Sequence, residues 1–388
     1  MIIMTKMNRN ICFIADDYPE EGRPVFTFVK NVVDELADNG NNCTVIAPFS
    51  ITRHKRFHKT YETYATSKGK IVKVYRPNIF TLSNHKILGF EPSSFMFSKA
   101  VCKILGILKE KPDIIYGHFW KNALCAYKFA SRNNIPLFVA TGESVINRND
   151  LSVNLGDFVK YVSGVICVST KNKEESIEKG LTVPEKCRVI PNAINPSIFK
   201  KMDKQECRRK LGFSPDIFIS ITVGAFIHRK GTLRVSSAID KIADDVFSVF
   251  IGNGTDVPNC KNILFCGRID NKDLPLYLNA ADIFVLPTLH EGCCNAIIEA
   301  MACGLPVVSS NLSFNWDILD NTNSILIDPN DVDEIANAIK LLKDNTLMRD
   351  SLSKGALEAA SLLTLHNRAK NIEHFINSNI PEMSINSF

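Results

Sequence analysis

Short apolar runs alternate with helical patterns along the whole chain, and this alternation limits the fold more than any other feature. In the first half, runs suited to strands occupy residues 11–15, 43–47, 71–75, 114–116, 137–140 and 165–168. Segments with apolar residues at helical spacing lie at 25–37, 93–109, 123–133 and 170–179. The second half repeats the scheme, with strand-like runs at 217–223, 247–251, 263–266, 283–286, 307–309 and 324–327. Strands that alternate with helices predict an α/β fold with two doubly wound parallel sheets.

The length of 388 residues suits two such domains, and a stretch enclosed by prolines offers a boundary. Pro191 and Pro196 enclose residues 192–195, which suit a hinge. We therefore expect a first domain over 1–193 and a second over 194–364. Ala369, Ile372 and Phe375 have helical spacing and predict a last helical segment over about 365–388.

Composition excludes several classes of protein. A hydrophobic content of 45% with 22% charged residues is ordinary for a globular chain. Residues 1–10 lack the apolar centre of a signal peptide, and no window approaches 18 uncharged apolar residues, so we expect a cytoplasmic protein. The twelve cysteines show no C-x-x-C pair, which favours reduced core residues over disulfides or a zinc site.

The net charge of +5 is distributed unevenly. Residues 1–195 carry 27 Lys and Arg against 18 Asp and Glu, whereas the remainder carries 19 against 23. Nine basic residues, from Arg53 to Lys86, face only Glu62 within the segment 53–86. Such a segment suits contact with anionic lipid at the inner face of the cell membrane, at roughly 1 kcal/mol per basic residue. A solvated basic face is the alternative, and no nucleic-acid-binding pattern accompanies these residues.

Two glutamates, Glu291 and Glu299, lie eight positions apart where a strand, a loop and a helix follow one another. Asn295 suits the N-cap of that helix, and Gly304 suits its end. In open α/β sheets, ligands bind beyond the carboxyl ends of the strands, where helix N-termini bind anions. A phosphate between two carboxylates that bind hydroxyl groups is the pattern of a nucleotide-sugar pocket. The alternative is a solvated loop glutamate and an ion-pairing helical one.

Arg229 and Lys230 follow the strand at 217–223 and precede Gly231 in a second strand-to-helix turn. Both cations can reach a phosphate beyond the sheet edge. Two cations and a helix N-terminus can together stabilise a departing diphosphate, so no metal is required.

These motifs resemble the retaining glycosyltransferases of family 4, which have an E-x7-E motif and the two-domain GT-B fold. Residues 223–231, V-G-A-F-I-H-R-K-G, resemble the phosphate loop of that family, and residues 265–269 with 274–282 resemble its base-binding loop and next helix. Residues 189–194 resemble its interdomain hinge. The resemblance implies two Rossmann-like domains that face a central cleft, with the C-terminal helix crossing back to the first domain. The first domain would bind the acceptor, and the second would bind the nucleotide-sugar donor.

The resemblance also implies roles for individual residues in a reaction that needs no cofactor. Glu291, Arg229 and Lys230 would be catalytic, and Glu299 would bind the ribose. The remaining donor contacts would come from Gly224, Gly292, Cys293, Cys294, Asn295, Gly267, Arg268 and Ile269. The acceptor would be a glycan or a lipid-linked glycan in the synthesis of surface polysaccharide or lipopolysaccharide.

The chain departs from the family pattern in two places. Ala225 stands where the phosphate loop often has an arginine, and Gly142 stands where a histidine is common in the first domain. Glu143 or His118 could supply the missing contact, and Gly22 lies in a thin glycine turn after the first strand.

Other functions stay open from the sequence alone. They are a non-catalytic nucleotide-sugar binder, an epimerase or phosphorylase of the same architecture, and a glycosidase that uses the two glutamates as acid and nucleophile. A nicotinamide dehydrogenase is the weakest alternative, because no G-x-G-x-x-G follows the first strand. The sequence does not identify the base, the sugar, the acceptor or the oligomeric state.

Overall fold

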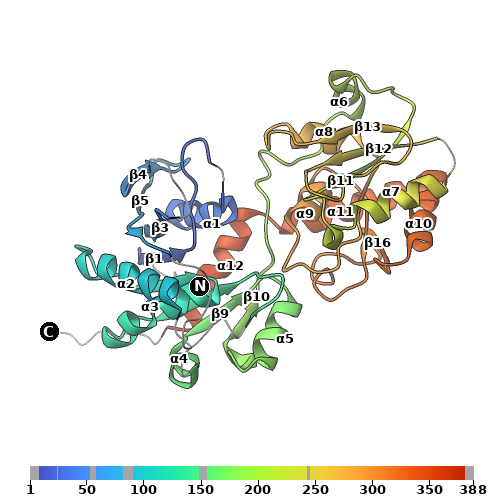
Figure 1. Cartoon of the computed structure of the whole chain (residues 1–388). Helices are drawn as coiled ribbons and strands as arrows, with labels where there is room; N and C mark the ends of the chain where they lie inside the picture. The colour runs from blue at the N-terminus through green and yellow to red at the C-terminus, as the bar shows by residue number, and fades with distance from the viewer. Residues whose placement is uncertain are drawn as a thin grey trace, which may run out of the picture. The chain divides into compact units, whose positions relative to one another are not determined.

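The computed structural model describes residues 8–23, 25–52, 58–81, 91–147, 155–242 and 245–380 (Figure 1). The chain divides into two compact units. The first comprises Met1–Val168, Asn172–Ile190 and Arg368–Phe388, and the second comprises Ser169–Lys171 and Pro191–Asn367.

An eight-stranded sheet with the order β10-β9-β8-β7-β1-β2-β5-β4 forms the centre of the first unit. Its strands are β1 (Asn10–Ala15), β2 (Asn42–Ile46), β4 (Tyr61–Ala65), β5 (Ile71–Tyr75), β7 (Ile114–His118), β8 (Leu137–Thr141), β9 (Gly164–Cys167) and β10 (Cys187–Val189). All neighbours pair in parallel except β4 and β5. Two short strands, β3 (Phe49–Ser50) and β6 (Asn78–Ile79), pair separately.

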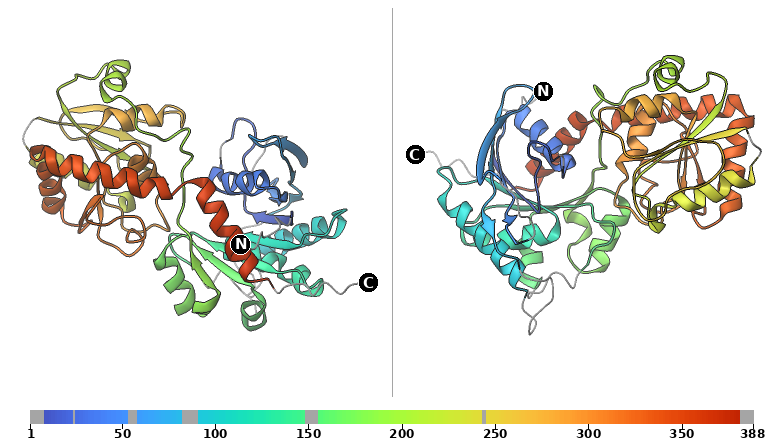
Figure 2. Two further views of the ribbon diagram at one scale, coloured as in Figure 1. Left: turned by 180° about the vertical axis from the view of Figure 1, so that it is seen from behind. Right: turned by 45° about the horizontal axis from the view of Figure 1, so that its top comes forward.

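Helices cover both faces of this sheet, as Figure 2 shows. They are α1 (Thr27–Asp38), α2 (Pro92–Ile107), α3 (Trp120–Arg132), α4 (Leu155–Tyr161), α5 (Thr170–Glu178), the 3-10 turn η2 (Pro184–Lys186) and α12 (Leu365–Ser378). Side chains of β1 alternate between the faces: Phe13 packs in the core under α1 and α12, whereas Cys12 and Ile14 pack in the core under α2, α3 and α4. This two-sided burial explains the uninterrupted apolar runs of the sequence.

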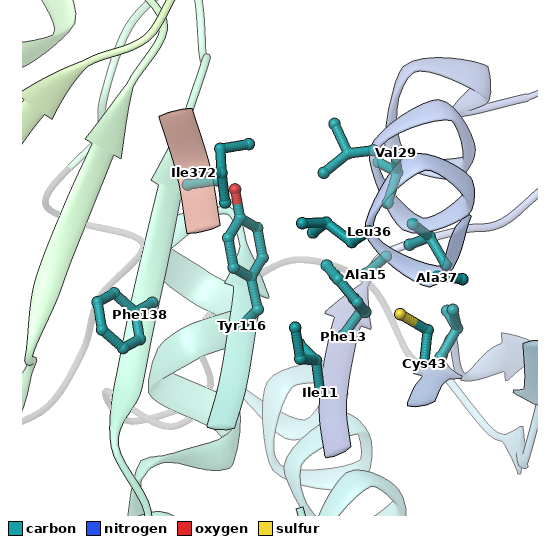
Figure 3. Close-up of a cluster of buried hydrophobic side chains, with 14 of the residues drawn as sticks. Ile11, Phe13, Ala15, Val29, Leu36, Ala37, Cys43, Tyr116, Phe138 and Ile372 are labelled. Atoms are coloured by element: carbon teal, nitrogen blue, oxygen red, sulfur yellow. The ribbon is translucent and has the colours of Figure 1, made fainter. Parts of the chain in front are cut away.

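The last helix, α12, belongs to the first unit for most of its length. Its residues Ile372 and Phe375 are buried in the same core as Tyr116 and Phe138. Figure 3 shows Ile372 beside Tyr116, which projects from β7. A helix from the end of the chain therefore completes a core that the first residues begin.

The second unit has a six-stranded parallel sheet with the order β13-β12-β11-β14-β15-β16. Its strands are β11 (Phe218–Val223), β12 (Val246–Ile251), β13 (Ile263–Gly267), β14 (Ile283–Leu286), β15 (Val307–Ser310) and β16 (Ser324–Ile327). Its helices are α6 (Lys204–Leu211), the 3-10 turn η3 (His228–Lys230), α7 (Thr232–Lys241), α8 (Leu274–Ala280), α9 (Asn295–Ala302), α10 (Val332–Asp344) and α11 (Thr346–Leu362). Helices α7 and α10 share one core with side chains of β12 and β14.

The two doubly wound α/β sheets match the predicted fold class, and the differences are local. Helix α1 starts two residues later than predicted, because Phe26 has a left-handed backbone with φ of 51°. Helix α3 starts three residues earlier than predicted, because the carboxylate of Glu143 accepts a hydrogen bond from Trp120 N at 3.4 Å. The edge strand β4 was not predicted. It pairs only with β5, and its residues are exposed or half-buried, so it lacks an apolar run.

Candidate functional site

The site lies at the carboxyl edge of the second sheet, where the strand order reverses. From β11 the chain proceeds outward through β12 and β13, and from β14 it proceeds outward in the opposite direction through β15 and β16. Ligands of doubly wound sheets bind at such a switch point. The loops after β11 and β14 carry Arg229, Lys230 and Glu291, so the topology brings together side chains that lie about sixty residues apart in sequence.

Arg229 and Lys230 both pair with one oxygen of Glu291. Arg229 Nη1 lies 2.6 Å and Lys230 Nζ 2.5 Å from Glu291 Oε1, and Thr288 Oγ1 donates to the same oxygen at 3.0 Å. The side chains of Lys230 and Glu291 are each 12% exposed. Among the described residues, no hydrogen-bond donor is assigned to Oε2 of Glu291, so that oxygen is available to a ligand.

The protein keeps Lys230 charged despite its burial. Desolvation by itself would lower the pKa of Lys230, but the neighbouring Cys294 and Glu291 more than offset it, and the net shift is upward. Burial raises the pKa of the Cys294 thiol, whose sulfur lies 3.9 Å from Lys230 Nζ. The charged ammonium of Lys230 therefore lies beside Cys294, at the N-cap of α9.

Helix α9 begins at Asn295, with Cys294 at the N-cap, and the prediction of Asn295 as N-cap was wrong by one residue. The amide oxygen of Asn295 is buried and has no hydrogen-bond partner among the described residues, so it does not cap the helix. Within the described chain, no hydrogen bond uses the backbone N–H groups of Gly292, Cys294 or Asn295. These donors lie at the positive end of the helix dipole, next to Lys230, where backbone N–H groups are suited to bind an anion.

The end of α9 follows the prediction. Gly304 has φ of 81°, and its N–H bonds to Met301 O at 2.9 Å, while Leu305 N bonds to Ala300 O at 3.0 Å. These two bonds form a Schellman motif, which favours glycine at this position.

Glu299 lies one turn into α9, and its carboxylate is mostly buried. Burial raises its pKa to about 7, and desolvation is the sole cause. The described residues make no ion pair with it, in contrast to Glu291. A carboxylate with these properties is poised to accept hydrogen bonds from hydroxyl groups of a ligand.

Glycines end three neighbouring strands of the second sheet, and one of them was missed in the sequence. Gly224 follows β11, Gly267 ends β13, and Gly252 follows β12 between them. Gly224 N bonds to Ile251 O at 2.9 Å, and Gly252 N bonds to Gly267 O at 2.8 Å. A Cβ on Gly252 would lie 1.8 Å from Gly224 O, so only glycine fits. The spacing of Gly252 and Gly254 after an apolar strand was the available signal.

The remaining predicted donor residues lie around this edge. Arg268 is exposed and Ile269 half-buried, and both follow β13, two strands away from β11. Cys293 is buried, and its carbonyl accepts a hydrogen bond from Asn192 Nδ2 at 3.0 Å. No described contact joins Arg268 or Ile269 to the Arg229–Lys230–Glu291 cluster.

The predicted contacts of the first unit lie at the carboxyl edge of its own sheet or in a nearby turn. His118 ends β7 and is buried; burial first, and the charge of Arg368 second, lower its pKa to about 3. Glu143 accepts hydrogen bonds from Thr141 Oγ1 at 2.6 Å and Gly142 N at 2.9 Å, and burial raises its pKa. Gly22 lies in an exposed turn with φ of 73°. The ring of His118 packs against Phe28 and Phe119, and its Nδ1 is buried without a hydrogen-bond partner among the described residues. The carboxylate of Glu143 accepts a hydrogen bond from Trp120 N at the start of α3.

The basic segment 53–86 is only partly described. Arg53, Lys55, Arg56 and Lys86 lie outside the described residues. Lys59, Lys68, Lys70 and Lys73 are exposed, as predicted for a basic surface. Arg76 is not part of that surface: it is 2% exposed and pairs with Glu62 Oε1 at 2.6 Å.

The described residues contain neither a candidate metal site nor a candidate membrane-spanning helix. No group of three or more His, Cys, Asp or Glu side chains there could hold a metal ion. No helix in the same part of the chain is long and apolar enough to cross a bilayer. The expectations of a metal-independent reaction and of a cytoplasmic protein stay predictions.

Comparison with known proteins assigns both units. Residues 25–198 match the family described as Glycosyltransferase Family 4, and residues 203–359 match the family described as Glycosyl transferases group 1. The chain is 30% identical over 268 residues to an Escherichia coli UDP-Gal:alpha-D-GlcNAc-diphosphoundecaprenol alpha-1,3-galactosyltransferase, covering 62% of this chain and 68% of the relative. It is 28% identical over 352 residues to a putative teichuronic acid biosynthesis glycosyltransferase of Bacillus subtilis, covering 85% and 88%.

Solved structures show the same fold at low identity. A sucrose-phosphate synthase of Thermosynechococcus elongatus superimposes with a TM-score of 0.75 at 18% identity, covering 96% of this chain and 99% of that one. HepE of Anabaena, in complex with UDP and glucose, superimposes with a TM-score of 0.70 at 17% identity, covering 96% and 100%. These likenesses confirm the predicted GT-B fold class.

Proposed function

The chain belongs to the glycosyltransferases that join a family 4 domain to a group 1 domain, and we propose that it transfers a hexosyl group, with retention, from a nucleotide sugar to a glycan or lipid-linked glycan. Two relatives support this choice of substrates. One is described as a galactosyltransferase that uses UDP-Gal and a diphosphoundecaprenol-linked sugar, and the other as a teichuronic acid glycosyltransferase. A UDP-sugar donor and a role in surface polysaccharide synthesis are the corresponding proposals for this chain.

The observation that carries the proposal is the cluster of Arg229, Lys230 and Glu291 at the switch point. Two cations, one of them mostly buried and kept charged, converge within 2.6 Å of a single carboxylate oxygen. They lie next to backbone N–H groups at the start of α9 that bond to none of the described residues. A diphosphate offers the same kind of oxygen to both cations and to the helix end. In a mostly buried setting these fixed donors stabilise negative charge that develops on a leaving group.

We assign the neighbouring residues by their chemistry. Glu291, with Oε2 available, accepts hydrogen bonds from the hydroxyl groups of the transferred sugar, while Arg229 and Lys230 bind the diphosphate. Glu299 accepts hydrogen bonds from the ribose. Gly224 and Gly267 open the sheet edge for the nucleotide, and the base packs against Arg268 and Ile269.

The proposed reaction needs no metal and no protein nucleophile. The bond between the anomeric carbon and the donor's phosphate oxygen breaks, and the acceptor hydroxyl forms its bond on the same face of the sugar. The hydroxyl proton passes to the leaving phosphate, whose charge Arg229, Lys230 and the start of α9 stabilise. Peripheral contact with an anionic membrane through segment 53–86 is a separate proposal, supported by the exposed Lys59, Lys68, Lys70 and Lys73.

A thermal-shift screen of the full chain against UDP-, GDP-, ADP- and dTDP-sugars tests donor binding, since a bound ligand raises Tm by an amount that grows with its affinity. Lys230→Met should reduce donor affinity at least tenfold, because a charge-assisted contact contributes about 1.5–3 kcal/mol. Lys241→Met is the matched control: Lys241 is exposed and pairs with Asp333 at the surface. The proposal fails if no donor raises Tm, or if Lys230→Met binds donor like the wild type.

Turnover separates the enzyme from its alternatives. NMR of the product's anomeric centre, made with a panel of glycan acceptors, should show retention, and activity should survive chelation of divalent metals. A donor that binds but is never consumed indicates a non-catalytic binder. A donor that is isomerised without any acceptor indicates an epimerase.

A further inference from the structure

A polar cavity of about 300 Å³ lies at the carboxyl edge of the first sheet, and no predicted site residue lines it. It lies among the ends of β1, β2, β3 and β6 and the first turns of α2 and α3. Its volume is at the lower end of the range for small-molecule pockets, which suits one sugar ring. The aromatic rings of Phe49 and Phe97 contribute apolar surface, and the remaining lining is mostly polar.

Two buried polar atoms in this lining have no hydrogen-bond partner among the described residues. Asn122 is fully buried; its amide nitrogen donates to His118 O, and its Oδ1 has no hydrogen-bond partner. Ser94 Oγ is also buried without a partner. An unsatisfied buried polar atom costs about 1–3 kcal/mol, so two of them in one cavity indicate that a ligand satisfies them.

Asp16, directly after β1, supplies a carboxylate to the same cavity. Among the described residues, no cation forms an ion pair with Asp16. The residue is exposed, yet desolvation by the surrounding protein raises the pKa of its carboxyl. A hydrogen bond from Asn122 and the charge of Lys121 offset part of this rise in pKa. A carboxylate in this setting accepts hydrogen bonds from hydroxyl groups.

The charges of the cavity decide which ligands fit. The two cations in its lining already have anionic partners: Arg76 pairs with Glu62 at 2.6 Å, and Lys121 pairs with Glu91 at 2.8 Å. Both nearby helix starts also have carboxylates, because Glu91 lies at the N-cap of α2 and Glu143 accepts from Trp120 N at the start of α3. Of the two carboxylates in the lining, Asp17 pairs with Arg23, and Asp16 has no ion pair among the described residues. The cavity therefore disfavours phosphates and uronic acids.

We infer that this cavity binds the terminal sugar of the acceptor, and that this sugar is uncharged, held by Asp16, Asn122 Oδ1 and Ser94 Oγ. The inference rests on the proposed glycosyl transfer and names the class of its acceptor. It assigns acceptor recognition to residues other than His118, Glu143 and Gly22.

Saturation-transfer NMR with the full chain tests the inference. The neutral probes are methyl glucoside and methyl N-acetylglucosaminide, and the anionic probes are methyl glucuronide and methyl glucoside 6-phosphate. A neutral probe should bind at least tenfold more tightly than its anionic counterparts. Asp16→Asn should weaken neutral-probe binding about tenfold and Ser94→Ala about three- to tenfold, as expected for loss of a charged and of a neutral hydrogen bond.

Two controls separate binding from folding. Asp157→Asn removes an exposed carboxylate of α4, outside the cavity lining, and should leave probe binding unchanged. Ser94→Ala should not lower Tm, because the hydroxyl has no partner to lose. The inference is overturned if no neutral probe binds, if an anionic probe binds more tightly, or if binding survives both Asp16→Asn and Ser94→Ala. Failure of the proposed function would appear separately, as a wild-type chain that binds no nucleotide sugar.

Discussion

Replacing Glu299 by glutamine should make the protein more stable at high pH. Burial raises the pKa of Glu299 from 4.5 to about 7, so ionisation disfavours the folded state. The contribution of the neutral carboxyl to the free energy of unfolding is fully present below pH 4.5, and it is lost as the pH rises through the folded-state pKa of about 7. At about 1.4 kcal/mol per pKa unit, the change between pH 5 and pH 8 is about 2–3 kcal/mol. Glutamine is neutral throughout, so Glu299→Gln lacks this loss.

Donor binding should change in the opposite direction. If Glu299 accepts hydrogen bonds from the ribose, the ionised carboxylate binds best. Lowering the pH from about 8 to 6 protonates most of it and should weaken nucleotide-sugar binding by about tenfold. Glu299→Gln should bind donor weakly at both pH values, because an amide replaces the charged acceptor.

Thermal unfolding and calorimetry measure the two effects separately. For a unit of this size, 2–3 kcal/mol corresponds to a Tm difference of about 5–10 °C between variant and wild type at pH 8, shrinking towards pH 5. Glu358→Gln, an exposed glutamate of α11, should show neither effect. The reasoning is refuted if the Tm difference is the same at pH 5 and pH 8, or if the variant binds donor with wild-type affinity at pH 8.

Three further substitutions test other parts of the second unit. Gly252→Ala should unfold the donor-binding edge and abolish the nucleotide-induced rise in Tm, since its Cβ would lie 1.8 Å from Gly224 O. Asp282→Asn should cost about 3–5 kcal/mol in denaturant unfolding, because it leaves the buried Arg208, now 2.7 Å from that carboxylate, without its ion-pair partner. Glu291→Gln should still bind a nucleoside diphosphate in calorimetry, because the substitution leaves Arg229 and Lys230 free to contact the phosphates. The rate of sugar transfer should fall at least a hundredfold, because the contact of Glu291 with the transferred sugar is lost.

The order of strands and helices could be predicted from the sequence because both sheets are buried on both faces. A parallel strand that is buried on both faces has a continuous run of apolar residues, as in β1 and β14. Such runs are easy to recognise in the sequence. The edge strand β4 lacks that signature, because its side chains are mostly exposed. The start of α3 depends on the carboxylate of Glu143, more than twenty residues away, and no local pattern contains it.

The candidate donor residues could be predicted because their chemistry is local to two loops. Arg229 with Lys230, and Glu291 with the start of α9, each follow a strand, and a sheet edge brings such loops together. The lining of the first-unit cavity could not be predicted in this way. Asp16, Ser94 and Asn122 come from three elements and belong to no motif. Ser94 and Asn122 become candidates for ligand contact only because the fold buries their oxygens without a partner among the described residues.

The pairing of Arg229 and Lys230 with Glu291 links the stability of the empty site to its proposed use. Two adjacent cations, one mostly buried, would repel each other without a counter-charge, and Glu291 Oε1 supplies that charge at 2.5–2.6 Å. A donor diphosphate has anionic oxygens that can replace Glu291 as the ion-pair partner of Arg229 and Lys230. Glu291 then exchanges charged partners for sugar hydroxyls, and no charge is left buried alone at any stage. In the proposed reaction, the carboxylate that stabilises the empty site is therefore the group that positions the transferred sugar.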